Sequence, residues 1–91
     1  MNTKELKDLY DKMLQVHSKV ETIYEQGTIS SMLRNEYNNK VSQYDGMYQS
    51  IEDMKAITDK EDTIASLINQ QIEILNVRIQ WELDWAKRAI G

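Results

Sequence analysis

Apolar residues recur with helical spacing over the N-terminal part of the chain. Their spacings alternate between three and four residues, which places them on one stripe of a helix. The stripe comprises Leu6, Leu9, Met13, Val16, Val20 and Ile23, and it is widened on one side by Tyr10, His17 and Tyr24. We therefore predict a helix over residues 3–26, begun by a capping box of Asn2 and Glu5 and ended by Gly27 in the left-handed conformation.

A second helical pattern follows the connector at residues 27–31, in which Ser30 or Thr28 can serve as the N-cap. Its stripe is rich in tyrosine and comprises Leu33, Tyr37, Val41, Tyr44, Tyr48, Ile51 and Met54. This pattern predicts a helix over residues 31–57. Glycine inside a helix costs about 1 kcal/mol relative to alanine. Because Gly46, in the Asp45-Gly46 pair, falls on the outer face, we expect the helix to continue through it.

The C-terminal part carries two apolar stripes, so it predicts a helix over residues 59–90 with two neighbours. One stripe comprises Ile64, Ile68, Ile72, Leu75, Ile79, Leu83, Ala86 and Ile90. The other comprises Leu67, Ile74, Trp81 and Trp85, and a narrow polar line of Gln71, Arg78 and Glu82 separates the two at 100° per residue. A capping box over residues 58–61 is expected to begin this helix.

These three segments predict one fold class. It is all-α, an elongated antiparallel three-helix bundle of coiled-coil character, in which residues 1–91 form a single helical domain with short loops near Gly27 and Thr58. The third helix is the longest, so its C-terminal turns are expected to reach or pass the corner at residues 27–29. In that arrangement Trp81 and Trp85 are partly exposed.

The composition limits the catalytic and metal-binding chemistry that the chain can carry out. The 91 residues include no Cys, no Pro and a single His, which excludes disulfides, Cys-based zinc sites and multi-His metal centres. His17 has no catalytic motif around it, so we expect no enzyme activity, no cofactor and no metal, and we interpret His17 as packed at the edge of the core. With 11 basic and 15 acidic residues, the net charge of −4 and the absence of a basic patch argue against nucleic-acid binding.

The aromatic residues favour recognition of a protein. Five Tyr and two Trp occur without any Phe, and Tyr and Trp keep a polar atom available at a half-wet surface. The predicted partner-binding residues are Trp81, Trp85, Arg78, Ile74, Leu67 and Glu82. Two interpretations of Arg78 and Glu82 stay open: an ordinary surface pair, or a pair that with Gln71 fixes register across an interface.

The function that we predict is a small non-catalytic helical module that binds a protein partner stoichiometrically, as an adaptor, inhibitor or chaperone of bacterial or phage type. A self-assembling structural or scaffold subunit, forming a dimer or other homo-oligomer, is the alternative. No small-molecule substrate is expected. The N-terminus lacks the apolar core of a signal peptide, and no apolar run reaches five residues, so we expect a cytoplasmic protein that is not inserted in a membrane.

One motif suggests a further alternative. Tyr44-Asp45-Gly46 lies near the middle of a short, acidic, cysteine-free and helical chain. In this respect the sequence resembles the Trp-x-Gly helical hairpins exported by type VII secretion systems, although Tyr stands in place of Trp and the break at Gly27 has no counterpart in a simple hairpin. The resemblance implies a secretion substrate or its partner.

Overall fold

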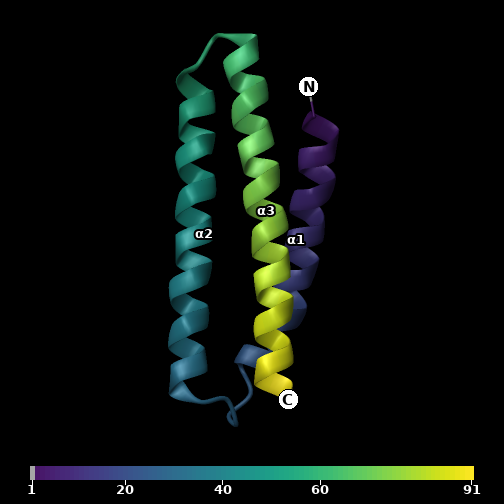
Figure 1. The fold of residues 1–91 in the computed structure, drawn as a ribbon, viewed down its shortest axis with the longest axis vertical. Helices are drawn as coiled ribbons and strands as arrows, with labels where there is room; N and C mark the ends of the chain where they lie inside the picture. The colour runs from purple at the N-terminus through teal and green to yellow at the C-terminus, as the bar shows by residue number, and fades with distance from the viewer. Residues whose placement is uncertain (1) are drawn as a thin grey trace.

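Three long helices make up the protein. The computed structural model describes residues 2–91 and contains α1 (Thr3–Tyr24), α2 (Ser31–Ile57) and α3 (Glu61–Ile90). Successive helices run in opposite directions along a body 49 Å long and 20 by 15 Å across (Figure 1). The predicted fold class, an elongated all-α bundle of three antiparallel helices with short loops near Gly27 and Thr58, is confirmed.

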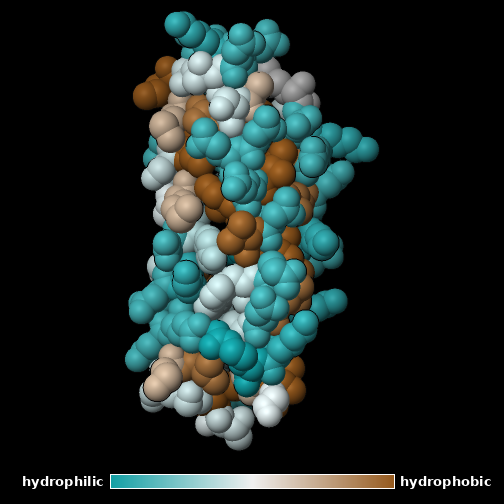
Figure 2. Space-filling model, in the orientation of Figure 1, coloured by the Kyte–Doolittle hydropathy of each residue, from teal (hydrophilic) through white to brown (hydrophobic). Residues whose placement is uncertain are grey.

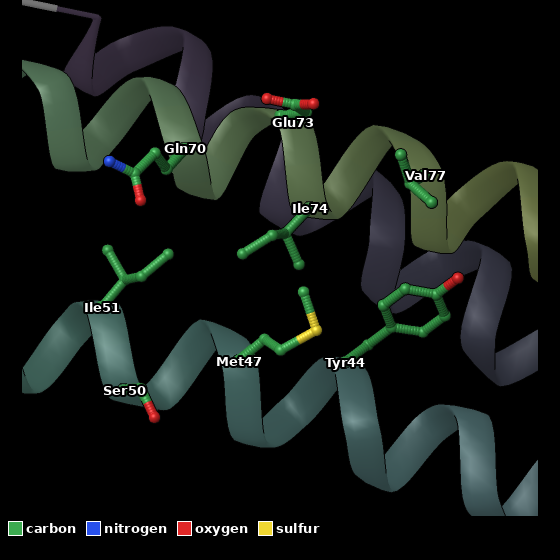
Figure 3. A pocket seen from close by; sticks show the side chains of 8 residues that line it. All are labelled: Tyr44, Met47, Ser50, Ile51, Gln70, Glu73, Ile74 and Val77. Carbon is green, nitrogen blue, oxygen red and sulfur yellow. The ribbon is translucent and has the colours of Figure 1, made fainter.

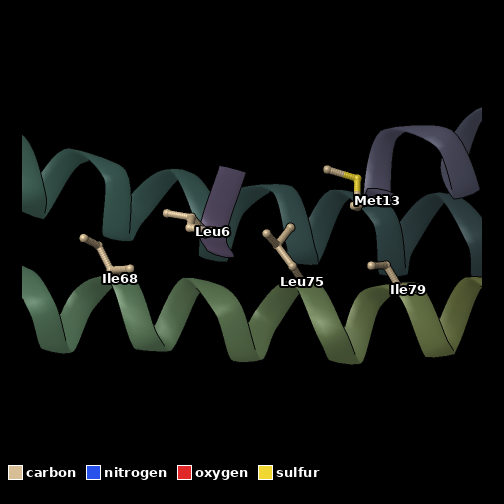
Figure 4. Packing of buried hydrophobic residues seen from close by; sticks show 5 residues of the cluster. All are labelled: Leu6, Met13, Ile68, Leu75 and Ile79. Carbon is tan, nitrogen blue, oxygen red and sulfur yellow. The ribbon is translucent and has the colours of Figure 1, made fainter. Parts of the chain in front are cut away.

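Helix α3 is the shared element of the bundle, because it packs along both α1 and α2. The first buried cluster joins α1 to α3 and consists of Leu6, Met13, Ile68, Leu75 and Ile79 (Figure 4). The second brings all three helices together and consists of Val20, Tyr37, Trp85 and Ala86. The two apolar edges of α3 therefore have two neighbours, as the two stripes predicted.

Helices α1 and α2 meet through long aromatic side chains. The ring centroids of Tyr10 and Tyr48 are 5.4 Å apart, and those of Tyr24 and Tyr37 are 5.1 Å apart. Tyrosine is long enough to span the space between two helix backbones that do not pack closely. The tyrosine-rich stripe of α2 thus reaches both of its neighbours.

The ends of α1 differ from the prediction. Asn2 is the N-cap residue but forms no side-chain capping bond. Its Nδ2 donates a hydrogen bond to Asn69 Oδ1 of α3 at 3.1 Å. The helix ends at Tyr24 with Glu25 as an αR C-cap, two residues before the predicted end. No residue in the range 2–91 has a positive φ, so the predicted left-handed Gly27 is wrong. A side-chain bond from Arg34 to the carbonyl of Gln26 ties this turn to α2 instead.

The predicted bounds of α2 are confirmed. The Ser30 side chain accepts a hydrogen bond from the Leu33 amide at 3.2 Å, which makes it the N-cap. The helix continues without a break through Gly46, whose Cα faces open space.

The predicted capping box at the start of α3 is wrong. The Thr58 hydroxyl donates to the Met54 carbonyl at 2.7 Å and so closes the end of α2. Helix α3 begins at Glu61, two residues later than predicted, and its N-cap Lys60 makes no side-chain capping bond. No helix in the part of the chain that the structure describes combines the length and apolar character needed to cross a bilayer.

Candidate functional site

The polar line of α3 lies in the middle of its buried face. Gln71 and Glu82 are fully buried, and Arg78 is 5% exposed. Because α1 covers one side of α3 and α2 covers the other, the residues between the two apolar stripes face the junction of all three helices. The interpretation of Arg78 and Glu82 as a surface pair is therefore wrong, and the interface in which they lie is internal.

Glu82 is the centre of a hydrogen-bonded cluster. Its carboxylate accepts from the Tyr37 hydroxyl of α2 at 2.7 Å and from Arg78 Nε at 3.0 Å. The Nδ1 atom of His17 on α1 lies 3.0 Å from Glu82 Oε1, and its Nε2 lies 3.2 Å from Glu21 Oε2. One carboxylate thus holds side chains from three helices.

Two further groups complete this cluster. Arg78 Nη1 donates to Asp45 Oδ1 at 2.5 Å, so the guanidinium spans from the buried Glu82 to an exposed carboxylate of α2. Burial raises the pKa of Tyr37 far above its usual range, and the hydrogen bond to Glu82 raises it further. Tyr37 therefore remains a protonated donor at any physiological pH. The lone pairs of Glu82 are occupied by these donors, which indicates a structural role.

A second set of polar contacts lies nearer to the N-terminus of α3, at Gln71. Gln71 Oε1 accepts from Lys55 Nζ at 2.7 Å, and Gln71 Nε2 donates to Glu52 Oε1 at 3.1 Å. The hydrogen bond from Gln71 lowers the pKa of Glu52, burial acts in the opposite direction, and Lys55 adds to the lowering. Both partners of Gln71 belong to α2, so this contact fixes α2 against α3.

Trp85 is fully buried, which contradicts the predicted exposure at the end of α3. Its ring centroid lies 4.6 Å from that of Tyr37, and its indole Nε1 donates to the Leu33 carbonyl at 3.0 Å. The prediction was wrong because α1 and the start of α2 extend alongside the last turns of α3. Ile90, 73% exposed, is the apolar side chain left most uncovered in these turns among the residues that the structure describes.

The remaining predicted partner residues divide into two groups. Leu67, like Arg78 and Glu82, is buried and offers no surface to a partner. Trp81 and Ile74 are half-buried on the edge of α3 that faces α2. The Trp81 ring packs next to Tyr44, with centroids 6.4 Å apart. Ile74 and Trp81 therefore lie near the surface, whereas the other four predicted partner-binding residues are buried.

An open groove runs between α2 and α3. We call it the α2–α3 groove; it is lined by Tyr44, Met47, Ser50, Ile51, Gln70, Glu73, Ile74 and Val77 and has a volume of about 500 Å³. In Figure 3 the side chains of Met47 and Ile74 point toward one another across it. Figure 2 shows hydrophobic surface between the two helices, bordered by hydrophilic surface. Met47 and Val77 are 42% and 50% exposed, so the groove is apolar and accessible.

Sequence reasoning did not identify Met47 and Val77. The signal was present in the spacing: Met47 lies seven residues before Met54, and Val77 lies three residues after Ile74 and four before Trp81. Each therefore adds a short apolar row beside a predicted stripe. It was overlooked because each row is short and the two rows lie on different helices. Only their position in space brings them to the same groove.

No three metal-binding side chains gather into a site within residues 2–91. Comparison of the chain with known protein families, with curated proteins and with solved structures finds no match.

Proposed function

We propose that this protein is a non-catalytic protein-binding module that engages one partner stoichiometrically through the α2–α3 groove. The observation that carries the proposal is the exposure of Met47 and Val77 in an apolar groove. Large apolar side chains that cluster at an accessible surface are typical of sites for protein partners.

The lining of the groove suits a helix of the partner. Helix-in-groove recognition uses an apolar groove between two helices, into which a third amphipathic helix lays its apolar face. Methionine at such a surface adapts to different side-chain shapes because its chain is unbranched and flexible. Ser50 and Gln70 add uncharged polar groups at the border of the groove.

The binding residues differ from those expected from the sequence. Ile74 is retained because it lines the groove, and Met47 and Val77 are added. Trp81 is half-buried next to the groove residue Tyr44 and is not part of the lining. Trp85, Leu67, Arg78 and Glu82 are buried. In this proposal they hold α2 and α3 at the separation that keeps the groove open, and they do not contact the partner.

The experiment compares capture of a partner by matched variants. Val77→Asp should abolish capture from the native host, because a carboxylate in the groove loses hydration when a partner helix covers it. Leu14→Asp is the control, since Leu14 is 47% exposed but lies on α1. Native mass spectrometry of the captured complex should show one partner per chain. Equal capture by Val77→Asp and wild-type protein contradicts the proposal.

A self-assembling subunit is the second candidate, and the exposed surface favours it. The chain exposes 6004 Å², whereas a folded monomer of 10.7 kDa exposes about 5,500 Å². Sedimentation of the purified protein separates the two candidates. A concentration-independent monomer supports a heterologous partner, and a discrete oligomer supports assembly.

A cytoplasmic location and a bacterial or phage source belong to this proposal as well. Fractionation of the native host, with the protein detected by antibody, tests the location.

A further inference from the structure

Three carboxylates form a ridge along α3. Asp62, Glu73 and Asp84 recur at intervals of 11 residues. Eleven residues make about three helical turns, so the three lie on one side of α3 over about 33 Å. Glu73 lines the α2–α3 groove, and Asp62 and Asp84 continue the ridge along α3 beyond the two ends of the groove. All three are exposed, and none forms an ion pair within residues 2–91.

The opposite border of the groove, on α2, is not acidic. Lys40 precedes Met47 by seven residues and so lies on the same side of α2, with its Nζ 5.9 Å from the ring centroid of Tyr44. Glu36 lies on this side too, but Arg88 neutralises it through a contact of 2.5 Å. The groove therefore has an acidic border on α3 and a weakly basic border on α2.

We propose that the α2–α3 groove binds a basic amphipathic helix of a partner protein. The apolar stripe of that helix lies on Met47, Ile74 and Val77, and its Lys or Arg residues face the ridge of Asp62, Glu73 and Asp84. This inference rests on the proposed function and adds the chemical class of the partner. A second copy of this chain paired antiparallel through the groove fits less well, because that arrangement opposes each ridge with itself, with Glu73 facing its own copy.

The test uses two synthetic helices that differ only in charge. Each is about 25 residues long, enough to span the ridge at 1.5 Å per residue. Both have leucine at the a and d heptad positions, with lysine on the flanks of one and glutamate on the flanks of the other. The protein carries ¹³C-methyl methionine. We expect the lysine helix to bind and to shift the methyl signals of Met47 and Met54, while those of Met13 and Met32 do not move.

A charge exchange tests the ridge itself. In Glu73→Lys/Asp84→Lys protein the preference should reverse in favour of the glutamate helix. Loss of each carboxylate, as in Glu73→Gln, should weaken the lysine helix about two- to fivefold at low salt. The control is Asp8→Lys/Asp11→Lys, which changes the net charge equally on α1 and should keep the preference for lysine. Binding of the lysine helix should weaken as salt is added.

Several results overturn this inference. The first is that the glutamate helix binds as tightly as the lysine helix, or more tightly. The second is that binding does not shift the methyl signals of Met47 and Met54. The third is that the protein forms a dimer and that Val77→Asp dissociates it. If Val77→Asp abolishes capture of the native partner while the two synthetic helices bind equally, the basic-helix inference fails and the proposed function stands. If Val77→Asp has no effect on capture, the proposed function itself fails.

Discussion

Glu82 shows how one side chain can determine the arrangement of three helices. It is fully buried, and its bonding partners come from α1, α2 and α3. A buried charge requires such partners because an uncompensated one is costly. Because these partners lie on three different helices, Glu82 favours the arrangement in which all of them reach its carboxylate.

Glu82→Ala should lower the free energy of unfolding by about 3–5 kcal/mol, because it leaves Arg78 with only the exposed Asp45 as a partner. Urea denaturation followed by circular dichroism measures the change. Glu73→Ala is the matched control on the same helix, and it should stay within about 0.5 kcal/mol of the wild type because Glu73 is exposed. Equal stability of the two variants would show that the Glu82 cluster is not structural.

Glu52 should make the fold sensitive to acid. Its pKa in the folded protein lies below the ordinary value of 4.5, chiefly because Gln71 donates a hydrogen bond to the carboxylate. A carboxyl with a lowered folded pKa stabilises the fold above its unfolded pKa, and this contribution is lost as pH falls through the folded value. Urea midpoints measured from pH 7 to pH 3 should therefore fall less for Glu52→Gln than for the wild type. Superimposable profiles would contradict this.

At the scale of the helices, local patterns explain the spans better than the ends. The interior of each helix follows from its apolar spacing, and all three exist where predicted. The ends depend on which side chain reaches which backbone group. Asn2 and Thr58 are good cap residues by type, yet Asn2 bonds to Asn69 of α3 and Thr58 bonds back to Met54. The partner of Asn2 is 67 residues away and is not visible in a local window. The partner of Thr58 is only four residues away, but the sequence pattern does not show whether Thr58 ends α2 or begins α3.

Gly46 weakens α2 at a position that tolerates a side chain. A Cβ added there meets no atom within 4 Å, and the helix is regular through it. Gly46→Ala should therefore raise the free energy of unfolding by about 0.5–1 kcal/mol, because alanine is the better helix former. Thermal and urea denaturation check the sign. Gly27→Ala, also in open space but in a loop, should change stability less. A loss of stability in Gly46→Ala would mean that the glycine is needed for close approach.

For the whole molecule, α3 is the element on which the other two depend. Both buried clusters include α3 residues, whereas α1 and α2 meet mainly through aromatic rings. The result is a thin, long body with more surface than a compact chain of its mass. In such a body one side of α3 stays uncovered next to α2, and the α2–α3 groove lies along this uncovered side.

Removal of α1 should therefore unfold the remaining hairpin. Without Leu6, Met13 and Val20, a fragment of residues 30–91 exposes one apolar edge of α3, and isolated helices are marginal in water. We expect the fragment to show low ellipticity and no cooperative transition. A peptide of residues 2–26 added in trans should restore both. A fragment that unfolds cooperatively alone would show that α2 and α3 need no third helix.

Hydrophobic spacing is a local property of each helix, so it was enough to predict the three helices, their antiparallel order and the two apolar edges of α3. It did not determine which part of an apolar edge is covered. Trp85 and Val77 both lie toward α2, yet one is fully buried and the other is half exposed. Coverage depends on where the neighbouring helices run and end, so this difference follows only from how the three helices pack. The α2–α3 groove therefore appeared at Met47 and Val77, in a place that no single helix reveals.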